Sequence, residues 1–139
     1  MPMQNPWSSL VYPQCILQED EEIINKCWSF TRPEHRPRKD LIPQPFIGSL
    51  SSAEVVLLNG NPYADDNDRE EQRKNQYLRD QLIKALTFKT NYKFFWLDPK
   101  LQGTGGDQWW RPKFKELLKE CALDSLAAKI MCIEWLSQS

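Results

Sequence analysis

The sequence has no long hydrophobic run and no excess of charge of either sign. Apolar segments such as Val55–Leu58 are far shorter than the roughly 20 residues that a membrane-spanning helix needs, so we expect no membrane association. The N-terminus also lacks the basic-then-apolar order of a signal peptide, which favours a cytoplasmic protein. With 18 Lys and Arg against 19 Asp and Glu, the chain lacks the excess of positive charge that is typical of proteins that bind the phosphates of nucleic acids strongly.

Closely spaced cysteines, a catalytic histidine and a phosphate loop are missing as well. The four cysteines show no CxxC spacing and stand among apolar neighbours, which favours reduced, buried thiols over a disulfide or a metal site. The one histidine, His35, lies in a Pro-rich stretch, so Ser or Cys nucleophilic catalysis has no base. Gly103–Gly106 lacks the Lys and Ser/Thr of a phosphate loop, and Asp98 and Asp107 fit turns better than a metal site. We expect no metal and no cofactor.

What is present is enough apolar material for one packed domain. The 139 residues are 40% hydrophobic and 12% aromatic, which excludes a disordered tail. Prolines in the first dozen residues predict an irregular N-terminal segment over residues 1–19. We expect a single α/β domain over residues 20–139, in which the basic, Pro-rich residues 31–45 form an extended connector.

The hydrophobic pattern predicts alternating strands and helices. The first apolar run does not alternate with polar residues, which is typical of a strand buried on both faces of a parallel sheet. This order predicts a short, mostly parallel sheet in a three-layer α/β/α arrangement. The last predicted strand ends close to Ser139, so we expect an incomplete domain. The predicted strands are residues 53–58, 92–97 and 130–135; the predicted helices are residues 20–28, a helix from 65 to 86, one starting at Pro112, and residues 124–128.

The loop after the first predicted strand is the first place to look for a site. Ligands of open α/β sheets bind beyond the carboxyl ends of the strands. Gly60 permits a close approach of the backbone to a ligand, and Pro62 stiffens the turn that follows. Asn-Gly and Asn-Pro are also ordinary turn sequences, so the loop alone leaves a purely structural interpretation open.

Here the sequence resembles a known family. Val55–Tyr63 is similar to the first motif of the uracil-DNA glycosylase superfamily, a buried strand followed by a Gly-Gln-Asp-Pro-Tyr or Gly-x-Asn-Pro-Gly loop. More broadly, Leu41–Asp68, Phe95–Pro99 and Gly105–Trp110 resemble uncharacterised bacterial proteins assigned to that superfamily. The resemblance implies a uracil-DNA glycosylase-like fold, in an incomplete form, and a role in DNA repair.

The resemblance also assigns roles to particular residues. Asn61 falls where the family positions the hydrolytic water, and an amide there orients water and stabilises an oxocarbenium-like transition state. Gly60 and Tyr63 fall in the part of the motif that shapes the base pocket. Phe94 or Phe95 is the candidate for stacking on an extruded base. Asn59 stands where the motif has its leading Gly.

A second group of residues is a candidate for holding nucleic acid. Trp109 and Trp110 follow the Gly-rich segment and are expected to stack on bases, although at least one of them also fits the core. Arg111, Lys113 and Lys115 are the candidate phosphate contacts.

Three hypotheses stay open. The chain is an active DNA N-glycosylase, or a non-catalytic relative that binds DNA, because the family's second motif, a His-Pro-Ser or Asn-Pro-Ser loop, is not found in the sequence. The alternative is a small non-catalytic α/β protein-interaction module with no nucleic-acid role. DNA is the candidate partner, and no protein partner is indicated.

Overall fold

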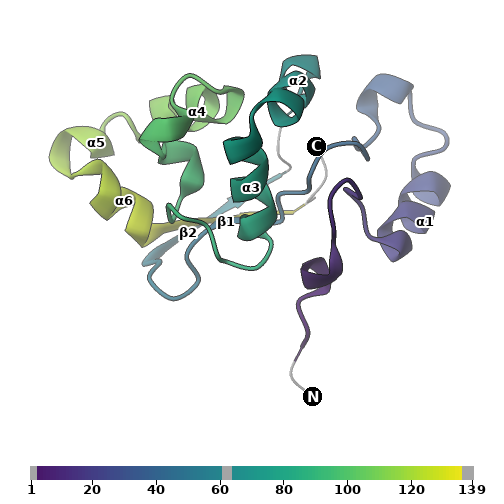
Figure 1. The fold of residues 1–139 in the computed structure, drawn as a ribbon, viewed down its shortest axis with the longest axis horizontal. Coiled ribbons are helices and arrows are strands. Elements are labelled where there is room, and N and C mark those ends of the chain that lie inside the picture. Colours follow the sequence, from purple (N-terminus) through teal and green to yellow (C-terminus); the bar gives the residue numbers. More distant parts are fainter. Residues whose placement is uncertain (1–2, 61–63, 136–139) are drawn as a thin grey trace.

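The computed structural model, which describes residues 3–60 and 64–135, is built on a three-stranded sheet (Figure 1). Its strands are β1 (Phe46–Gly48), β2 (Val55–Asn59) and β3 (Ile130–Glu134), in the order β1-β3-β2. The central strand β3 is parallel to β2 and antiparallel to β1. The sheet is therefore mixed, and the expectation of a mostly parallel sheet is wrong because the short strand β1 was not predicted.

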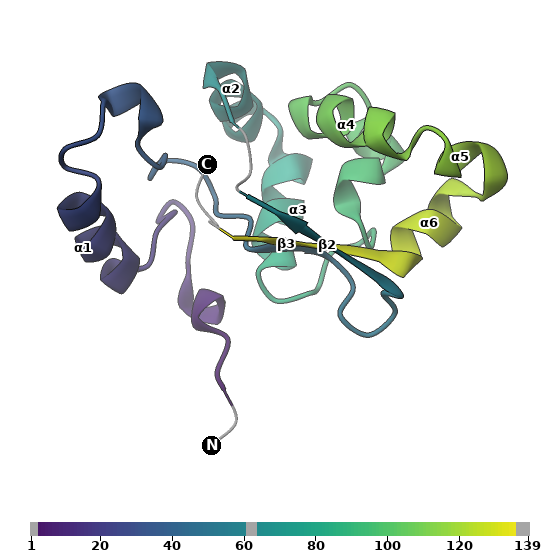
Figure 2. The ribbon, with the colours of Figure 1, turned by 180° about the vertical axis from the view of Figure 1, so that it is seen from behind.

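Helices cover one face of this sheet. Figure 2 shows α2 to α6 on the same side of the strands, with α1 at one end of the molecule. The arrangement therefore has two layers over the sheet region, in place of the three that were predicted. No helix in the described part of the chain is both long enough and apolar enough to cross a membrane. The helices are α1 (Gln18–Cys27), α2 (Asp66–Lys74), α3 (Gln76–Ala85), α4 (Gly105–Trp110), α5 (Leu117–Glu120) and α6 (Leu123–Lys129). The 3-10 turns are η1 (Pro6–Ser9), η2 (Pro33–His35), η3 (Phe95–Leu97), η4 (Pro99–Leu101) and η5 (Arg111–Phe114).

Strand β2 exists as predicted, but its environment does not match the prediction. Leu57 packs against the core, whereas Val56 and Leu58 on the opposite face are 53% and 82% exposed. β2 lies at the edge of the sheet and has helices on one side only. An apolar run without alternation thus marks an edge strand with one bare face here, a case that periodicity does not separate from a strand covered on both faces.

The predicted strand at residues 92–97 is wrong. Residues 95–97 form the turn η3, and Phe94, Phe95 and Leu97 are fully buried. The ring of Phe94 meets the edges of Trp110 and Phe114, with centroids 5.2 and 5.6 Å away. Aromatic enrichment favours strands in general, but these rings fill the core beneath the helices, and the segment pairs with no strand of the described sheet.

The long helical pattern after residue 65 is confirmed, in two pieces. Its predicted apolar stripe, Leu78, Leu82, Ala85 and Leu86, is buried. Asn75 ends α2 and caps α3, since its side-chain oxygen accepts a hydrogen bond from Leu78 N at 3.0 Å. A side chain that competes with the backbone in this way interrupts a helix that periodicity alone would continue.

The N-terminal segment is part of the domain. Leu10 and Cys15 are buried in the same core as the helices, and Asn5 Nδ2 donates to Leu86 O at 2.6 Å. None of the four cysteines, all of which lie in the described chain, forms a disulfide; Cys15 and Cys132 are buried as expected, but Cys27 is exposed. The boundary expected at residue 20 therefore does not separate an independent segment.

Gly48 offers a test of this sheet. Its φ is +111°, and an added Cβ would lie 2.5 Å from Ile130 O in the neighbouring strand. Gly48→Ala should lower the free energy of unfolding by about 2–4 kcal/mol, from left-handed strain plus overpacking. Gly103→Ala is the matched control, because Gly103 has a φ of +86° and open space around its Cβ position. It should cost only about 1 kcal/mol. Urea unfolding measures both, and equal losses would contradict the packing argument.

Candidate functional site

A pocket lies where the parallel strands β2 and β3 end. Its volume is about 480 Å³, within the roughly 300–1,000 Å³ range of small-molecule sites. Asn59 and Glu134, the last residues of the two strands, line it from the sheet. The beginnings of α2 and α4, together with Trp96, complete the wall. The pocket thus occupies the position that the carboxyl-end rule predicts.

The sheet side of the pocket is an amide and carboxylate pair. The parallel register places Asn59 opposite Glu134, and Asn59 Nδ2 donates to Glu134 Oε1 at 3.2 Å. The thiol of Cys132 donates to the same oxygen at 3.7 Å. Glu134 Oε2 is buried and has no hydrogen-bond partner within the described residues. A buried carboxylate oxygen without a donor is costly, so it marks a place where a ligand donor would be stabilising.

Burial raises the pKa values of two neighbouring groups, the Glu134 carboxyl and the Cys132 thiol. The carboxyl group of Glu134 is 6% exposed, and desolvation raises its pKa above the ordinary value, although the hydrogen bonds from Asn59 and Cys132 act in the opposite direction. Desolvation, with the neighbouring Glu134, raises the pKa of the Cys132 thiol to about 12. Cys132 therefore remains a protonated donor at neutral pH.

Aromatic rings form another part of the wall. Trp96 is buried, and its indole N–H donates to Gln44 Oε1 at 3.0 Å. Trp109 is 45% exposed, and Lys113 Nζ lies 3.3 Å from its ring centroid. Lys113 also donates to Trp109 O at 3.0 Å, which holds the ammonium group in place. Indole rings at a pocket favour flat ligands that can stack.

The two glycines that begin α4, Gly105 and Gly106, allow close packing of this helix against its neighbours. A Cβ on Gly106 would lie 2.2 Å from the Trp96 ring, and one on Gly105 would lie 2.4 Å from Asp68 Oδ1. Gly105 N donates to Glu71 Oε2 at 3.0 Å. A carboxylate of the protein itself therefore takes the backbone donor that a phosphate would need.

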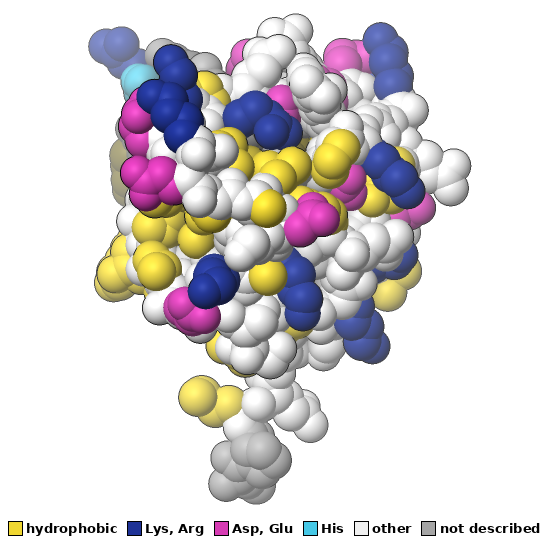
Figure 3. All heavy atoms as spheres, turned by 90° about the vertical axis from the view of Figure 1, so that its left-hand side faces the viewer, with side chains coloured by type: hydrophobic (Ala, Val, Ile, Leu, Met, Phe, Trp, Pro, Cys, Tyr) yellow, Lys and Arg dark blue, Asp and Glu magenta, His cyan; other side chains and the backbone are white. Residues whose placement is uncertain are grey.

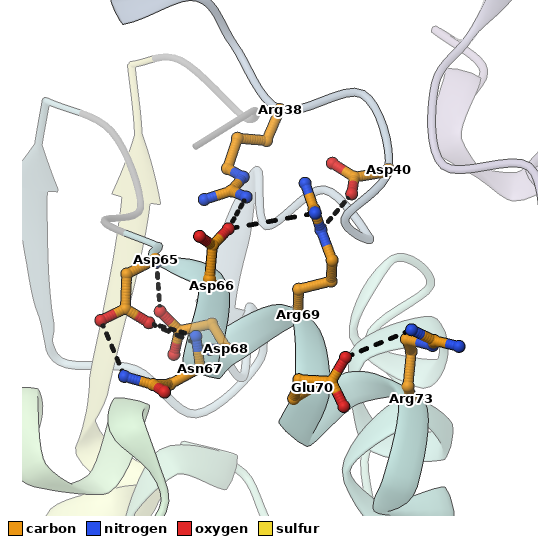
Figure 4. Close-up of polar contacts among 9 residues, drawn as sticks. All are labelled: Arg38, Asp40, Asp65, Asp66, Asn67, Asp68, Arg69, Glu70 and Arg73. Atoms are coloured by element: carbon orange, nitrogen blue, oxygen red, sulfur yellow. Dashed lines mark hydrogen bonds and ion pairs between the residues drawn. The ribbon is translucent and has the colours of Figure 1, made fainter. Parts of the chain in front are cut away.

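The start of α2 is acidic because it caps itself. Asp65 accepts hydrogen bonds from the backbone of Asn67 and Asp68, and Asp68 Oδ2 accepts from Asp65 N at 2.7 Å (Figure 4). These bonds form a capping box. They lower the pKa of Asp65, whereas burial raises the pKa of Asp68. The carboxylates thus have a structural role in the helix start.

Ion pairs lie on the outer side of this helix start. Arg38 bonds Asp66 at 2.6 Å, and Arg69 Nε lies 2.5 Å from Asp40 Oδ2 (Figure 4). The pocket lining itself includes four carboxylates and no Lys, Arg or His within the described residues. The electrostatics of the lining therefore favour a neutral or cationic group over a phosphate. The four carboxylates are those of Asp65, Asp68, Glu71 and Glu134.

The residues predicted from the motif are only partly visible. Asn61 and Tyr63 lie outside the described residues. Gly60 is exposed directly after β2, and among the described residues, its chain neighbours aside, no heavy atom lies within 4 Å of the position that a Cβ would take. Asn59 and Ala64, which flank that part of the loop, both line the pocket.

The predicted aromatic contacts need correction. Phe94 and Phe95 are both fully buried in the core, so neither ring is available to stack on a base. Trp110 is also buried, against Phe114 at a centroid distance of 5.8 Å. Of the predicted stacking residues in the described chain, Trp109 is the one that reaches both solvent and the pocket.

The predicted phosphate contacts lie close together in sequence but differ in their surroundings. Arg111 is held by Asp107 Oδ1 at 2.6 Å, Lys113 covers the Trp109 ring, and Lys115 is exposed. Figure 3 shows the end of the molecule that carries α5 and α6, where Lys and Arg side chains are dispersed among apolar, acidic and neutral ones. That end presents no continuous basic surface.

Sequence reasoning missed Glu134. Its signal is a single carboxylate inside the apolar run from Ile130 to Trp135. An acidic residue in a buried strand requires a partner or a function.

Comparisons with protein-family models, curated proteins and solved structures found no match to this chain. In the described chain, no group of three or more His, Cys, Asp or Glu side chains is arranged to hold a metal ion. The assignment of a function therefore depends on the pocket.

Glu134→Gln tests the burial of the carboxylate. Because folding raises the pKa of Glu134, its contribution to stability is fully present below the unfolded value near 4.5 and is lost as pH rises through the folded value. Relative to wild type, the variant should therefore gain stability from acidic to neutral pH, by on the order of 1 kcal/mol. Urea unfolding at several pH values measures this. Glu120→Gln, at an exposed position, should show no such trend. If the difference in stability between Glu134→Gln and wild type does not change with pH, the raised pKa of Glu134 is contradicted.

Proposed function

We propose that this chain is a uracil-DNA glycosylase-like protein that holds a nucleobase of a DNA strand in the pocket at the carboxyl ends of β2 and β3. The observation that carries the proposal is the position of this pocket. It is lined by Asn59, which lies within the segment that resembles the family's first motif, and by Ala64, which directly follows that segment. These two residues thus lie at the edge of the sheet where α/β proteins bind ligands.

The shape and chemistry of the pocket support a base as the ligand. A nucleobase is flat, and Trp96 and Trp109 supply indole surfaces in the wall. Its edge carries hydrogen-bonding groups, and the Asn59–Glu134 pair offers an amide and a carboxylate. An extruded base enters such a pocket by its edge while its sugar and phosphate stay outside.

The charge of the pocket favours a nucleobase inside it and the phosphates of the DNA backbone outside it. The lining carboxylates disfavour a phosphate inside the pocket. Lys113 lies over Trp109, and Lys115 is exposed two residues further along the chain, so these cations are the ones proposed to meet phosphates outside it.

Stacking on Trp109 provides the test of binding. Trp109→Ala should weaken binding of single-stranded DNA by about tenfold or more, since stacking on one aromatic residue contributes roughly 1–3 kcal/mol. Fluorescence anisotropy with a labelled oligonucleotide measures the dissociation constant. Trp135→Ala is the matched control: the Trp135 side chain is 88% exposed and is not among those that line the pocket, although its neighbour Glu134 is. Equal effects of the two substitutions would refute a pocket-specific role for Trp109.

A base-release assay separates an enzyme from a binding relative. Oligonucleotides that contain uracil, hypoxanthine or mismatched bases are incubated with the protein and scored for abasic sites. Release that Asn61→Ala abolishes at unchanged stability supports an active glycosylase; binding without release supports a relative that has kept the pocket but not the chemistry.

A protein-interaction module remains the second candidate. One observation favours it: the face of the sheet away from the helices exposes Val56, Leu58, Ile133 and Trp135. The salt dependence of the binding affinity distinguishes the two functions. Affinity that depends on phosphate contacts falls steeply as the salt concentration rises, whereas the affinity of an apolar interface hardly changes.

A further inference from the structure

We propose that Glu134 makes the pocket selective for nucleobases that carry an exocyclic amino group, of which cytosine is the test case, over bases with a carbonyl in that position, such as uracil. This inference rests on the proposed function, because it names the class of base that the same pocket takes. It differs from the preference for uracil that the family resemblance alone would imply.

The first step is the state of the two oxygens of Glu134. Oε1 already accepts hydrogen bonds from Asn59 Nδ2 at 3.2 Å and from the Cys132 thiol at 3.7 Å. Oε2 has no partner within the described residues and is shielded from solvent. One acceptor position at the sheet side of the pocket is therefore left for a donor that the protein itself does not supply.

The second step is that the neighbouring carboxylates are already used. Asp65 and Asp68 accept backbone N–H groups of the capping box, and Glu71 accepts from Gly105 N. Gln44 Oε1 accepts from the Trp96 indole. These groups hold the wall of the pocket together, so Glu134 is the carboxylate that is left to recognise the ligand.

The third step is the chemistry of the base edge. An ionised carboxylate accepts hydrogen bonds and donates none. The 4-amino group of cytosine donates to such an oxygen, as Glu and Asp do when they recognise cytosine in DNA. Uracil has nearly the same shape but presents a carbonyl oxygen there, which faces the carboxylate as a second acceptor. A buried acceptor left without a donor disfavours the wrong base more strongly than a change of size does.

The experiment compares bases at a single position. Short labelled strands carry one cytosine, one uracil or one N4,N4-dimethylcytosine, with abasic units elsewhere, and a fully abasic strand is the reference. Anisotropy at pH 8 gives the dissociation constants for the full chain. We expect cytosine to bind about tenfold more tightly than uracil, which corresponds to one specific base contact. N4,N4-dimethylcytosine, which has lost both donors, should bind as weakly as uracil.

Glu134→Gln tests the residue itself. The amide keeps the size of the side chain but adds an N–H donor, so the preference for cytosine should disappear or reverse in favour of uracil. Glu120→Gln is the control for loss of one carboxylate and should leave the preference unchanged. If Glu134→Gln does not fold, the dimethylated base still tests the contact on the wild-type protein.

The outcomes separate the two proposals. If the cytosine strand binds no more tightly than the abasic strand, no base enters the pocket, and the proposed function fails together with this inference. If all bases bind more tightly than the abasic strand, and Trp109→Ala weakens them, the proposed function stands. In that case equal affinity for cytosine and uracil, or a preference that survives dimethylation or Glu134→Gln, overturns the selectivity assigned to Glu134.

Discussion

The parallel pairing of β2 with β3 is the interaction on which the rest of the structure depends. It joins Asn59 to Glu134 across 75 residues of chain, and helices α2 to α6 make up most of the connection between the two strands. Parallel strands require such a crossover. All of these helices lie on one face of the sheet (Figure 2), so the carboxyl ends of the two strands open beneath the starts of α2 and α4. The pocket is a consequence of this connection.

The polar groups around the pocket disfavour a phosphate inside it. Helix starts often bind anions because their N–H groups lack partners. Here Asp65 caps α2, and Thr104 and Glu71 take the donors at the start of α4. Among the described residues that line the pocket, the buried side-chain atom without a hydrogen-bond partner is an acceptor, Glu134 Oε2. A hydrogen-bond donor at this position would therefore be stabilising, and the indole rings of Trp96 and Trp109 would favour a flat group.

Features that depend on neighbouring residues were predicted well. The acidic start of α2, the apolar stripe of α3 and the strand at residues 130–134 all follow from caps and periodicity. The expected stripe of α3 is buried and is the face that meets the core. The glycines of α4 have no local explanation in the sequence, because they are required by the close approach of Trp96 and Asp68, which lie distant in sequence.

The sequence by itself determined the capped start of α2, the apolar stripe of α3 and the apolar strand before the Asn-Gly turn, because caps, turns and periodicity are local. Only the tertiary structure decided that Phe94 and Phe95 fill the core, that β2 has a bare face, and that Glu134 meets Asn59. Each of these depends on which segments pack together across the chain. The free energy of burying a ring or a carboxylate is set by those distant neighbours, and no short window of sequence contains them.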